Sequence, residues 1–339
     1  MLRRLFKTRL GLVLALVGDL LLSGGPHLGP TVSQASLDAA LAAQAEVTDE
    51  WLAMDGVVGT AIGMGRGGEA VLKVYLAWPG AALLPARVAG VPVVFEVTGP
   101  IRALPAETST IDPKRNFERP VPIGVSTGHP DVSAGTIGAR VTDGTRVWAL
   151  SNNHVYANNN AARKGDNLLQ PGRADGGRDP DDAIGTLYDF EPVRFCNGPL
   201  CPVNPIDAAI ALTTPEELDA ATPEDGYGAP RSSSIEPRLG MTVQKYGRTT
   251  GHTRGRITGI NAILDVSYRT GRARFQGQIV ISGGRFSAPG DSGSLIVTDG
   301  VLLGDRVPVG LLFAGSSTST IANPIDPVLD RFGVRVDGG

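Results

Sequence analysis

Cysteine is scarce in this chain. The sequence of 339 residues contains two, Cys196 and Cys201, in the segment FCNGPLCPV. Without a matching Cys or His pair they cannot form a four-ligand zinc site, and the sequence predicts neither a metal nor a cofactor. In an oxidising compartment the two cysteines would form a small disulfide, and in a reducing one they would stay free thiols. The sequence leaves both alternatives open.

Net charge and aromatic residues are also low. The formal net charge is −3, aromatic residues make up 5% of the chain, and no stripe of Lys and Arg interleaved with aromatics occurs. A nucleic acid is therefore not expected as a partner. The oligomeric state is left open by the sequence.

Long hydrophobic runs are absent apart from one, Leu10 to Leu22. Basic residues precede it, so residues 1–25 resemble a secretory signal peptide, and the run is short for a membrane span. Asp19 interrupts the run and no Ala-x-Ala site follows, so the alternative is a translation start further along the chain. Export and a cytoplasmic location both stay open, and no stable membrane span is expected.

Glycine and proline, by contrast, are abundant, with 45 and 25 residues. Together with Asn and Asp they separate many short apolar runs, a pattern that favours strands and turns over long helices. The sequence therefore predicts a mainly β protein with length for two or three domains.

Residues 36–104 are expected to form a small α+β domain. A helix is predicted from Ser36, as N-cap, to Met54, followed by the strand-like runs VVGTAIGM, AVLKVYLAW and VPVVFEVTG. The first two runs enclose Gly63-x-Gly65-x-x-Gly68, the spacing of a dinucleotide-binding loop. That loop needs a helix directly after it, and here a strand follows, so a β-hairpin is predicted. The position of this domain suggests a pro-segment or, alternatively, a docking domain.

Residues 105–130 are rich in proline, charge and small side chains and are predicted to be a linker. From residue 131 to 336 short strand-like runs alternate with Gly, Asn, Asp and Pro turns, which indicates a barrel or sandwich. A short helix is predicted to start near Pro324.

The stretch APGDSGSLIV, in which Ser292 follows Gly290 and Asp291, raises the question of a nucleophilic serine. A serine hydroxyl is a poor nucleophile unless a base lies beside it. Of the four histidines, His154 comes just after the apolar strand VWALSN, where a base would be held rigidly yet open to a cleft. His27 and His129 lie in proline-rich segments and are expected to be solvated, and His252 is expected to be structural.

The base needs an acid that orients it, and Asp207 is the predicted partner. It directly precedes the apolar run AAIALT, so its carboxylate is expected to be partly buried, which costs free energy unless a cation or hydrogen-bond donor pairs with it. Asp181, Asp182 and Asp189 are rival candidates, in or near the turn GGRDPDDAIG.

The chain order His154, Asp207, Ser292 resembles that of the chymotrypsin-type (trypsin-like) serine proteases. The resemblance covers residues 131–336 and implies a double six-stranded β-barrel. It also implies that His154 is the general base, Asp207 its partner and Ser292 the nucleophile, with the backbone N–H groups of Gly290 and Ser292 as the oxyanion hole. The segments HPDVSAGTIGARV and NPIDPVLDRFGV look similar to bacterial trypsin-like proteins related to plant Narrow leaf 1. SNNHVYA around the histidine, and Ser294 after the motif, depart from the usual pattern.

Two finer expectations come from the same resemblance. KYGRTTGHTRG looks like the Gly-Arg-Thr-Thr-Gly hairpin of alpha-lytic-type proteases, which implies an ion pair between Arg248 and Asp291. By similarity, Phe286, Phe313 and Gly315 are expected to line an apolar pocket for the substrate residue before the cleaved bond.

The function predicted from the sequence is a serine endopeptidase that acts on a peptide or protein substrate through an acyl-enzyme. The alternative is a catalytically silent protein of protease fold that binds a partner. A non-proteolytic esterase would share the same chemistry, because a fold does not determine a substrate.

Overall fold

The structure, a computed structural model, describes residues 32–101, 111–282, 285–300 and 305–339. The predicted signal peptide, residues 1–25, lies outside the described residues. The chain from residue 31 to 339 forms one compact unit. Among its described helices, none combines the length and the apolar character that a membrane crossing requires.

The described chain begins with helix α1 (Gln34–Leu52) and three strands, β1 (Val57–Met64), β2 (Ala70–Leu76) and β4 (Val91–Val97). The helix starts slightly earlier than predicted because the Ser33 hydroxyl, not that of Ser36, caps it by accepting from the Ser36 N–H. Strands β1 and β2 form the predicted antiparallel hairpin, so the glycine-rich turn between them is not followed by a helix. β4 runs parallel to β2, and the two-residue strand β3 (Arg87–Val88) pairs with β4.

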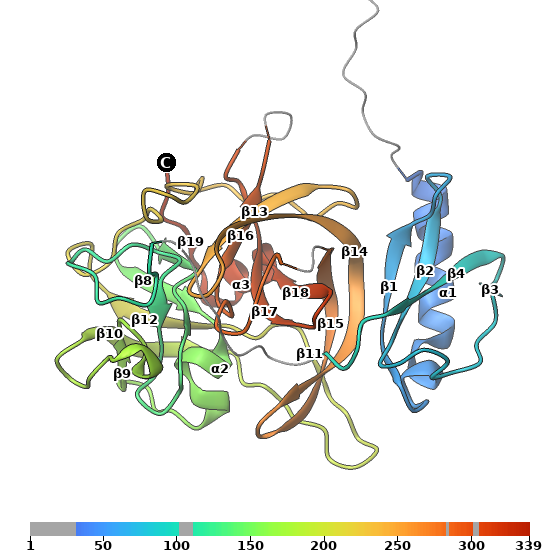
Figure 1. Cartoon of the computed structure of the whole chain (residues 1–339), viewed down its shortest axis with the longest axis horizontal. Coiled ribbons are helices and arrows are strands. Elements are labelled where there is room, and N and C mark those ends of the chain that lie inside the picture. Colours follow the sequence, from blue (N-terminus) through green and yellow to red (C-terminus); the bar gives the residue numbers. More distant parts are fainter. Residues whose placement is uncertain (1–31, 102–110, 283–284, 301–304) are drawn as a thin grey trace, which may run out of the picture. The chain divides into compact units, whose positions relative to one another are not determined.

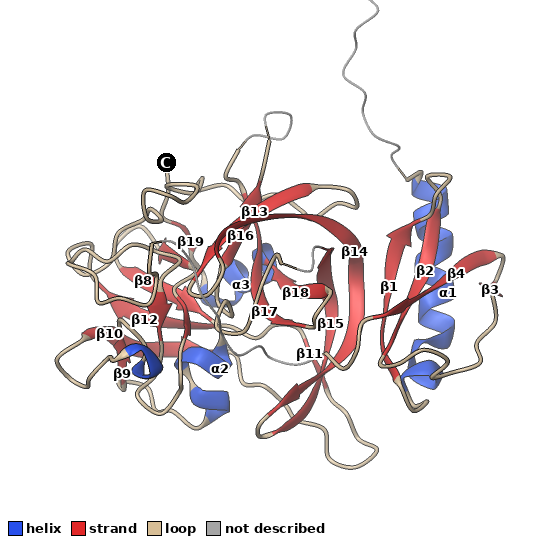
Figure 2. Cartoon of the chain, viewed as in Figure 1, coloured by secondary structure: helices blue, strands red, loops and turns tan. Residues whose placement is uncertain are grey.

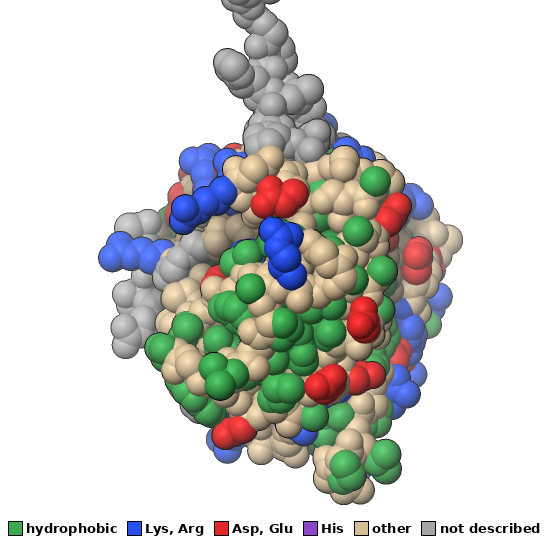
Figure 3. All heavy atoms as spheres, turned by 90° about the vertical axis from the view of Figure 1, so that its right-hand side faces the viewer, with side chains coloured by type: hydrophobic (Ala, Val, Ile, Leu, Met, Phe, Trp, Pro, Cys, Tyr) green, Lys and Arg blue, Asp and Glu red, His purple; other side chains and the backbone are tan. Residues whose placement is uncertain are grey.

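The apolar face of α1 packs on this small sheet, with Trp51, Leu72 and Val74 among the buried residues of the cluster. Figure 3 looks at this side of the molecule and shows hydrophobic side chains gathered on its surface among scattered charges. The large hydrophobic side chains exposed on this α+β part are Trp78, Leu83, Val94, Phe95 and Val97.

The α+β part continues directly into the rest of the protein (Figure 1). β1 pairs antiparallel with the long strand β14 (Gly251–Tyr268), so the small sheet and a larger one are a single 11-stranded sheet. Buried Gln44 of α1 strengthens the junction, because its amide donates to the Asn261 carbonyl and accepts from the Asn261 amide.

The larger sheet contributes six successive partners beyond this junction. Their order is β15 (Gly271–Ser282), β18 (Ser319–Pro324), β17 (Pro308–Gly315), β16 (Leu295–Thr298), β13 (Thr242–Gly247) and β14, and β14 also pairs with β15. The short strand β11 (Val203–Asn204) adds to the outer side of β15 in parallel.

A second sheet has six strands, in the order β19 (Arg335–Val336), β7 (Ala139–Thr142), β8 (Val147–Ser151), β12 (Ala209–Thr213), β10 (Ala183–Phe190) and β9 (Asn167–Leu169). A two-stranded pair, β5 (Ser126–Thr127) and β6 (Gly135–Thr136), lies outside both sheets. The predicted terminal helix is α3 (Ile325–Phe332), directly after Pro324. Figure 2 shows that strands dominate, and the predicted mainly β class is confirmed.

The segment expected as a linker, residues 105–130, differs from that expectation over its described part. From Phe117 onward its apolar side chains are buried, and Val121, Ile123 and Val125 belong to the core of the six-stranded sheet. Burial of this apolar area stabilises the segment on the six-stranded sheet, so the part of the chain that packs with this sheet begins well before residue 131.

Candidate active site

His154 and Asp207 come together because the strands beside them are neighbours. β8 ends at Ser151 and leads into the short helix α2 (Asn153–Tyr156), while Asp207 precedes β12, which pairs with β8 through Ala209 and Ser151. His154 Nδ1 lies 2.7 Å from Asp207 Oδ2, and the His154 backbone N–H donates to Oδ1 at 3.3 Å. The pairing leaves the other ring nitrogen, Nε2, as the acceptor of a neutral imidazole.

The Asp207 carboxylate is 0% exposed, and the His154 side chain is 12% exposed. The backbone of Asp207 is fixed on both sides, because its N–H donates to Asn323 Oδ1 and its carbonyl accepts from the amides of Asn152 and Asn323. A buried carboxylate held this firmly can orient an imidazole and stabilise its protonated form.

The turn that carries Ser292 packs against the strand that leads to His154. Gly293 has φ +99°, and a Cβ there would lie 2.2 Å from the Thr136 carbonyl oxygen and 2.3 Å from Ser151 Oγ. A Cβ placed on Gly135 would lie within 3.0 Å of both Val155 and the Ser292 carbonyl oxygen. Only glycine permits these approaches, which bring the serine turn to the end of β8.

The Ser292 hydroxyl donates to the Phe313 carbonyl at 3.4 Å. No hydrogen bond joins it to His154 within the part of the chain that the structure describes. The structure thus pairs the histidine with the aspartate and brings the serine turn beside them, with the hydroxyl turned to a backbone carbonyl. In enzyme structures without substrate, catalytic hydrogen bonds are often long or poorly aligned and tighten only when substrate binds.

Two backbone donors near Ser292 are unused. Among the described residues, the N–H groups of Gly290 and Ser292 have no acceptor, whereas those of Asp291, Gly293 and Ser294 all donate to carbonyl oxygens. Gly290 adopts φ +95°, and a Cβ there would lie 2.7 Å from both Arg248 Nη1 and Thr249 Oγ1. Unpaired N–H donors on a rigid turn beside a serine can bind an oxyanion.

The predicted ion pair between Arg248 and Asp291 is wrong. Asp291 pairs with Lys245, whose Nζ lies 3.3 Å from Oδ2, and both side chains are 0% exposed. The carboxylate also accepts from the N–H groups of Thr249, Thr250 and Ala288 and from the Thr250 hydroxyl. Burial lowers the pKa of the Lys245 ammonium below its ordinary value, while the charge of Asp291 acts to raise it. Lys245 therefore supplies the charge that was assigned to Arg248.

Arg248 instead binds Asp175, through Nε at 2.7 Å and through Nη2. Asp175 also accepts from the Ser126 hydroxyl at 2.6 Å. Two side-by-side donors of a guanidinium match the two oxygens of a carboxylate, and this pair is almost fully buried. Arg248 thus joins the hairpin of β13 and β14 to the segment between β9 and β10 of the six-stranded sheet.

The expected apolar pocket does not have the predicted walls. Phe286 is 1% exposed and packs in the core around Ile281 and Leu312, and Phe313 is 0% exposed and packs against Phe275. Because both rings are buried in core clusters, neither offers surface to a substrate in this conformation. The segment next to the serine turn presents Ser287, whose hydroxyl lies 2.5 Å from Thr320 Oγ1, together with partly exposed Ala288 and Pro289. Gly315 is buried, and Arg285 is exposed.

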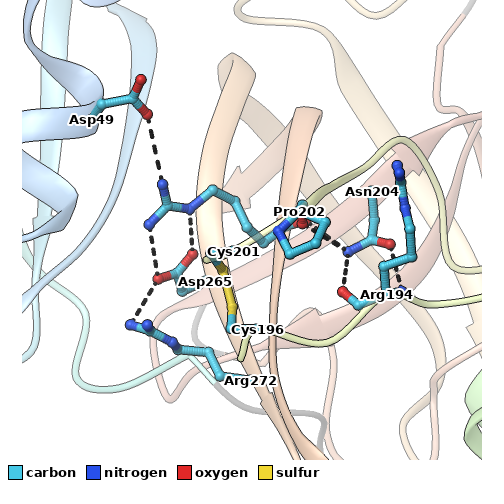
Figure 4. The surroundings of a disulfide bond; sticks show 9 residues. Asp49, Arg194, Cys196, Cys201, Pro202, Asn204, Asp265 and Arg272 are labelled. Carbon is cyan, nitrogen blue, oxygen red and sulfur yellow. Dashed lines mark hydrogen bonds and ion pairs between the residues drawn. A yellow bond between two sulfur atoms is a disulfide. The ribbon is translucent and has the colours of Figure 1, made fainter. Parts of the chain in front are cut away.

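Cys196 and Cys201 are joined by a disulfide. Figure 4 shows it beside a network in which Arg272 and Arg274 of β15 both bind Asp265 of β14, with Arg274 also reaching Asp49 of α1. The Cys196 N–H donates to the Arg272 carbonyl at 2.7 Å. The disulfide loop is therefore attached to the hairpin of β14 and β15.

The rival aspartates lie elsewhere. Asp189 binds Lys164 and Arg331, and Asp182 accepts from the Asn116 amide. His129, expected to be solvated, is buried and contacts Asp166 at 3.1 Å, while His252 contacts Gln244 at 2.8 Å. Within the described ranges, no cluster of three or more His, Cys, Asp or Glu side chains is arranged to hold a metal ion.

No model of a known protein family matches this chain, and no curated protein matches it. Solved structures do match. Thermobifida fusca protease A is similar over 65% of this chain and 100% of its own, with 20% identity and a TM-score of 0.46. A glutamic-acid-specific serine protease that uses a histidine triad in substrate binding is similar over 64% of this chain and 100% of its own, with 21% identity and a TM-score of 0.45. Cellulomonas bogoriensis chymotrypsin is similar over 66% of this chain and 100% of its own, with 21% identity and a TM-score of 0.44.

These neighbours are bacterial serine proteases of chymotrypsin type, the class that the sequence resembles. The narrower likeness to proteins related to Narrow leaf 1 stays a prediction.

Three residues at the site were missed in the sequence. Lys245 could have been found, because a charged residue in the strand-like run TVQKYG is unusual unless it pairs with a buried residue of opposite charge. Asp175 and Tyr268 had none, since each lies in a turn-rich stretch and meets its partner only through the fold. Tyr268 donates to Asp207 and is taken up below.

Proposed function

We propose that this chain is a serine endopeptidase that hydrolyses peptide bonds through an acyl-enzyme. The observation that carries the proposal is the 2.7 Å contact of His154 Nδ1 with the fully buried Asp207 carboxylate. A buried charge is costly unless it is paired, and here the partner is an imidazole whose second nitrogen is free to act as a base. The unused donors of Gly290 and Ser292 add a second, independent support.

In the proposed reaction, the Ser292 hydroxyl turns from the Phe313 carbonyl to His154 Nε2. His154 removes its proton as Oγ attacks the carbonyl carbon of the scissile bond, and Asp207 stabilises the imidazolium that forms. The Gly290 and Ser292 N–H groups bind the developing oxyanion, a contribution of about 10²–10³ in kcat per donor. The proton passes from His154 to the leaving amine, and a water molecule repeats the sequence to release the acid and regenerate Ser292.

A fluorophosphonate probe tests the proposal, because it reacts with an activated serine and not with an ordinary one. Wild type should be labelled stoichiometrically, and Ser292→Ala should not be labelled. Ser232→Ala, at an exposed serine in the loop before β13, is the matched control and should react like wild type. An unreactive wild type would favour the alternative, a catalytically silent protein of protease fold. Parallel assays with an amide and an ester substrate distinguish an endopeptidase from an esterase.

A further inference from the structure

A tyrosine hydroxyl shares the carboxylate oxygen that holds the catalytic candidate His154. Tyr268 Oη donates to Asp207 Oδ2 at 2.8 Å, and His154 Nδ1 contacts the same oxygen at 2.7 Å. The other oxygen, Oδ1, receives the His154 backbone N–H. Apart from His154, Tyr268 is therefore the one group in the described chain that donates to this buried carboxylate.

The ring of Tyr268 is fixed by other rings. It stands at an angle to His154 and to Phe195, with centroids 5.8 Å away in each case, and Phe275 lies 6.2 Å away. Burial, together with the charge of Asp207, raises the pKa of Tyr268 well above its ordinary value. The hydroxyl consequently stays protonated and keeps donating over the whole range in which a histidine can act as a base.

The backbone that carries Tyr268 is also held in place. Tyr268 is the last residue of β14 and pairs with Gly271 at the tip of the hairpin. Phe195, beside Cys196, packs on this tip, and the Cys196 N–H donates to the Arg272 carbonyl.

The segment that leads to Asp207 follows the same hairpin. Asn204 of β11 donates its amide to the Arg274 carbonyl at 3.0 Å, and the Gln278 amide donates to the Pro205 carbonyl at 2.9 Å. Because the tyrosine and the aspartate are attached to one hairpin, their contact survives small movements of the rest of the site.

We propose that Tyr268 is a positioning residue of the catalytic triad. Its hydroxyl fixes the rotation of the Asp207 carboxylate so that Oδ2 faces His154 Nδ1. The same hydrogen bond stabilises part of the negative charge on Oδ2, which would otherwise be stabilised by the histidine alone. Two donors on one carboxylate oxygen compete, so the hydroxyl sets the strength of the bond between the histidine and the aspartate. The proposal rests on the proposed function, since it gives this pair its catalytic meaning.

The test is Tyr268→Phe, which keeps the ring and removes only the hydroxyl. The first readout is the downfield proton resonance of the His154 Nδ1–H in protein labelled with ¹⁵N-histidine, measured without substrate. We expect this resonance to move, because the carboxylate loses its competing donor. The second is steady-state kinetics, where kcat should fall about ten-fold with KM unchanged, since a donor to a charged group is lost but no substrate contact is.

Tyr188→Phe is the matched control, because Tyr188 contacts Arg146 and Trp148 far along the six-stranded sheet and should leave both readouts unchanged. Should Tyr268→Phe fail to fold, Phe195→Leu keeps the hydroxyl but removes one supporting ring. It should move the resonance part of the way in the same direction, and an unmoved resonance in that folded variant would overturn the proposal.

The two proposals fail separately. If wild type reacts with the fluorophosphonate while folded Tyr268→Phe keeps both the resonance and kcat, the positioning role is wrong and the endopeptidase stands. If wild type is inert to the probe but its resonance depends on Tyr268, the enzymatic function is wrong and the positioning of His154 by this hydroxyl stands.

Discussion

Replacing Lys245 with methionine removes the positive charge beside Asp291 and keeps a similar side-chain volume. At the observed 3.3 Å, two unit charges attract by about 5 kcal/mol at an effective dielectric constant of about 20. The net loss is smaller, because burying the ammonium itself costs free energy, as its lowered pKa indicates. Three backbone N–H groups and one hydroxyl also remain on the carboxylate.

We therefore expect Lys245→Met to lower the free energy of unfolding by about 3 kcal/mol, the lower end for a broken buried pair. For a chain of this size the melting temperature should fall by roughly 4 °C. Activity should fall further than stability alone explains. Asp291 holds the turn from Ala288 to Ser292, and misplacing a single oxyanion donor lowers kcat by about 100-fold.

The assay measures thermal unfolding by calorimetry. It also measures kcat on a peptide substrate, at a temperature where both proteins are folded. Lys245→Met combined with Asp291→Asn removes both charges and should recover part of the lost stability, which makes a double-mutant cycle. Lys164→Met, at an exposed pair with Asp189, is the control and should cost less than 1 kcal/mol. The reasoning is refuted if Lys245→Met keeps wild-type stability and activity, or if the double variant is less stable than either single one.

Three further outcomes are expected. His154→Ala and Ser292→Ala should each abolish nearly all hydrolysis, and the double variant should be little worse, because the two residues act as a unit. Losses that multiply in the double variant would contradict the triad. Arg248→Met should lower the free energy of unfolding by about 3–5 kcal/mol, because it leaves Asp175 buried without its cation, and adding Asp175→Asn should restore part of the lost stability. Denaturant unfolding measures both changes, and an unchanged midpoint in the single variant would show that the pair is dispensable. Cleavage of a peptide library should not favour Lys or Arg before the cleaved bond, because the segments 285–290 and 313–318 contain no carboxylate and the adjacent Asp291 is buried against Lys245. Dominant cleavage after Lys or Arg would rule this out.

The sequence predicted those features that depend on local pattern and chain order. The turn around Ser292, the strand before His154 and the apolar run after Asp207 are each visible in a few residues, and the alternation of short runs with turns indicated the mainly β class. The hairpin of β1 and β2 followed from two strand-like runs joined by glycines. These features could be predicted because the residues that determine them are close in the sequence.

Ion-pair partners could not be predicted in this way. Arg248 and Lys245 lie in one hairpin beside the same turn, and sequence similarity favoured the arginine for Asp291. The fold decides otherwise, because the Lys245 side chain is in the interior with Asp291, whereas Arg248 meets Asp175 from another part of the chain. The prediction of the apolar pocket was wrong for a related reason, because the position of Phe286 along the chain does not reveal how deeply its side chain is buried.

The antiparallel ladder between β1 and β14 has a consequence for any processing of the chain. Suppose that the α+β part were a pro-segment, cut from the remainder after β4. The pairs of Gly59 with Leu264, Thr60 with Ile263 and Ile62 with Ile260 would persist after the cut, as would the amide contacts of Gln44 with Asn261. The severed piece would stay bound as a subunit, and its departure rate would be set by local unfolding of this ladder rather than by the rate of cleavage.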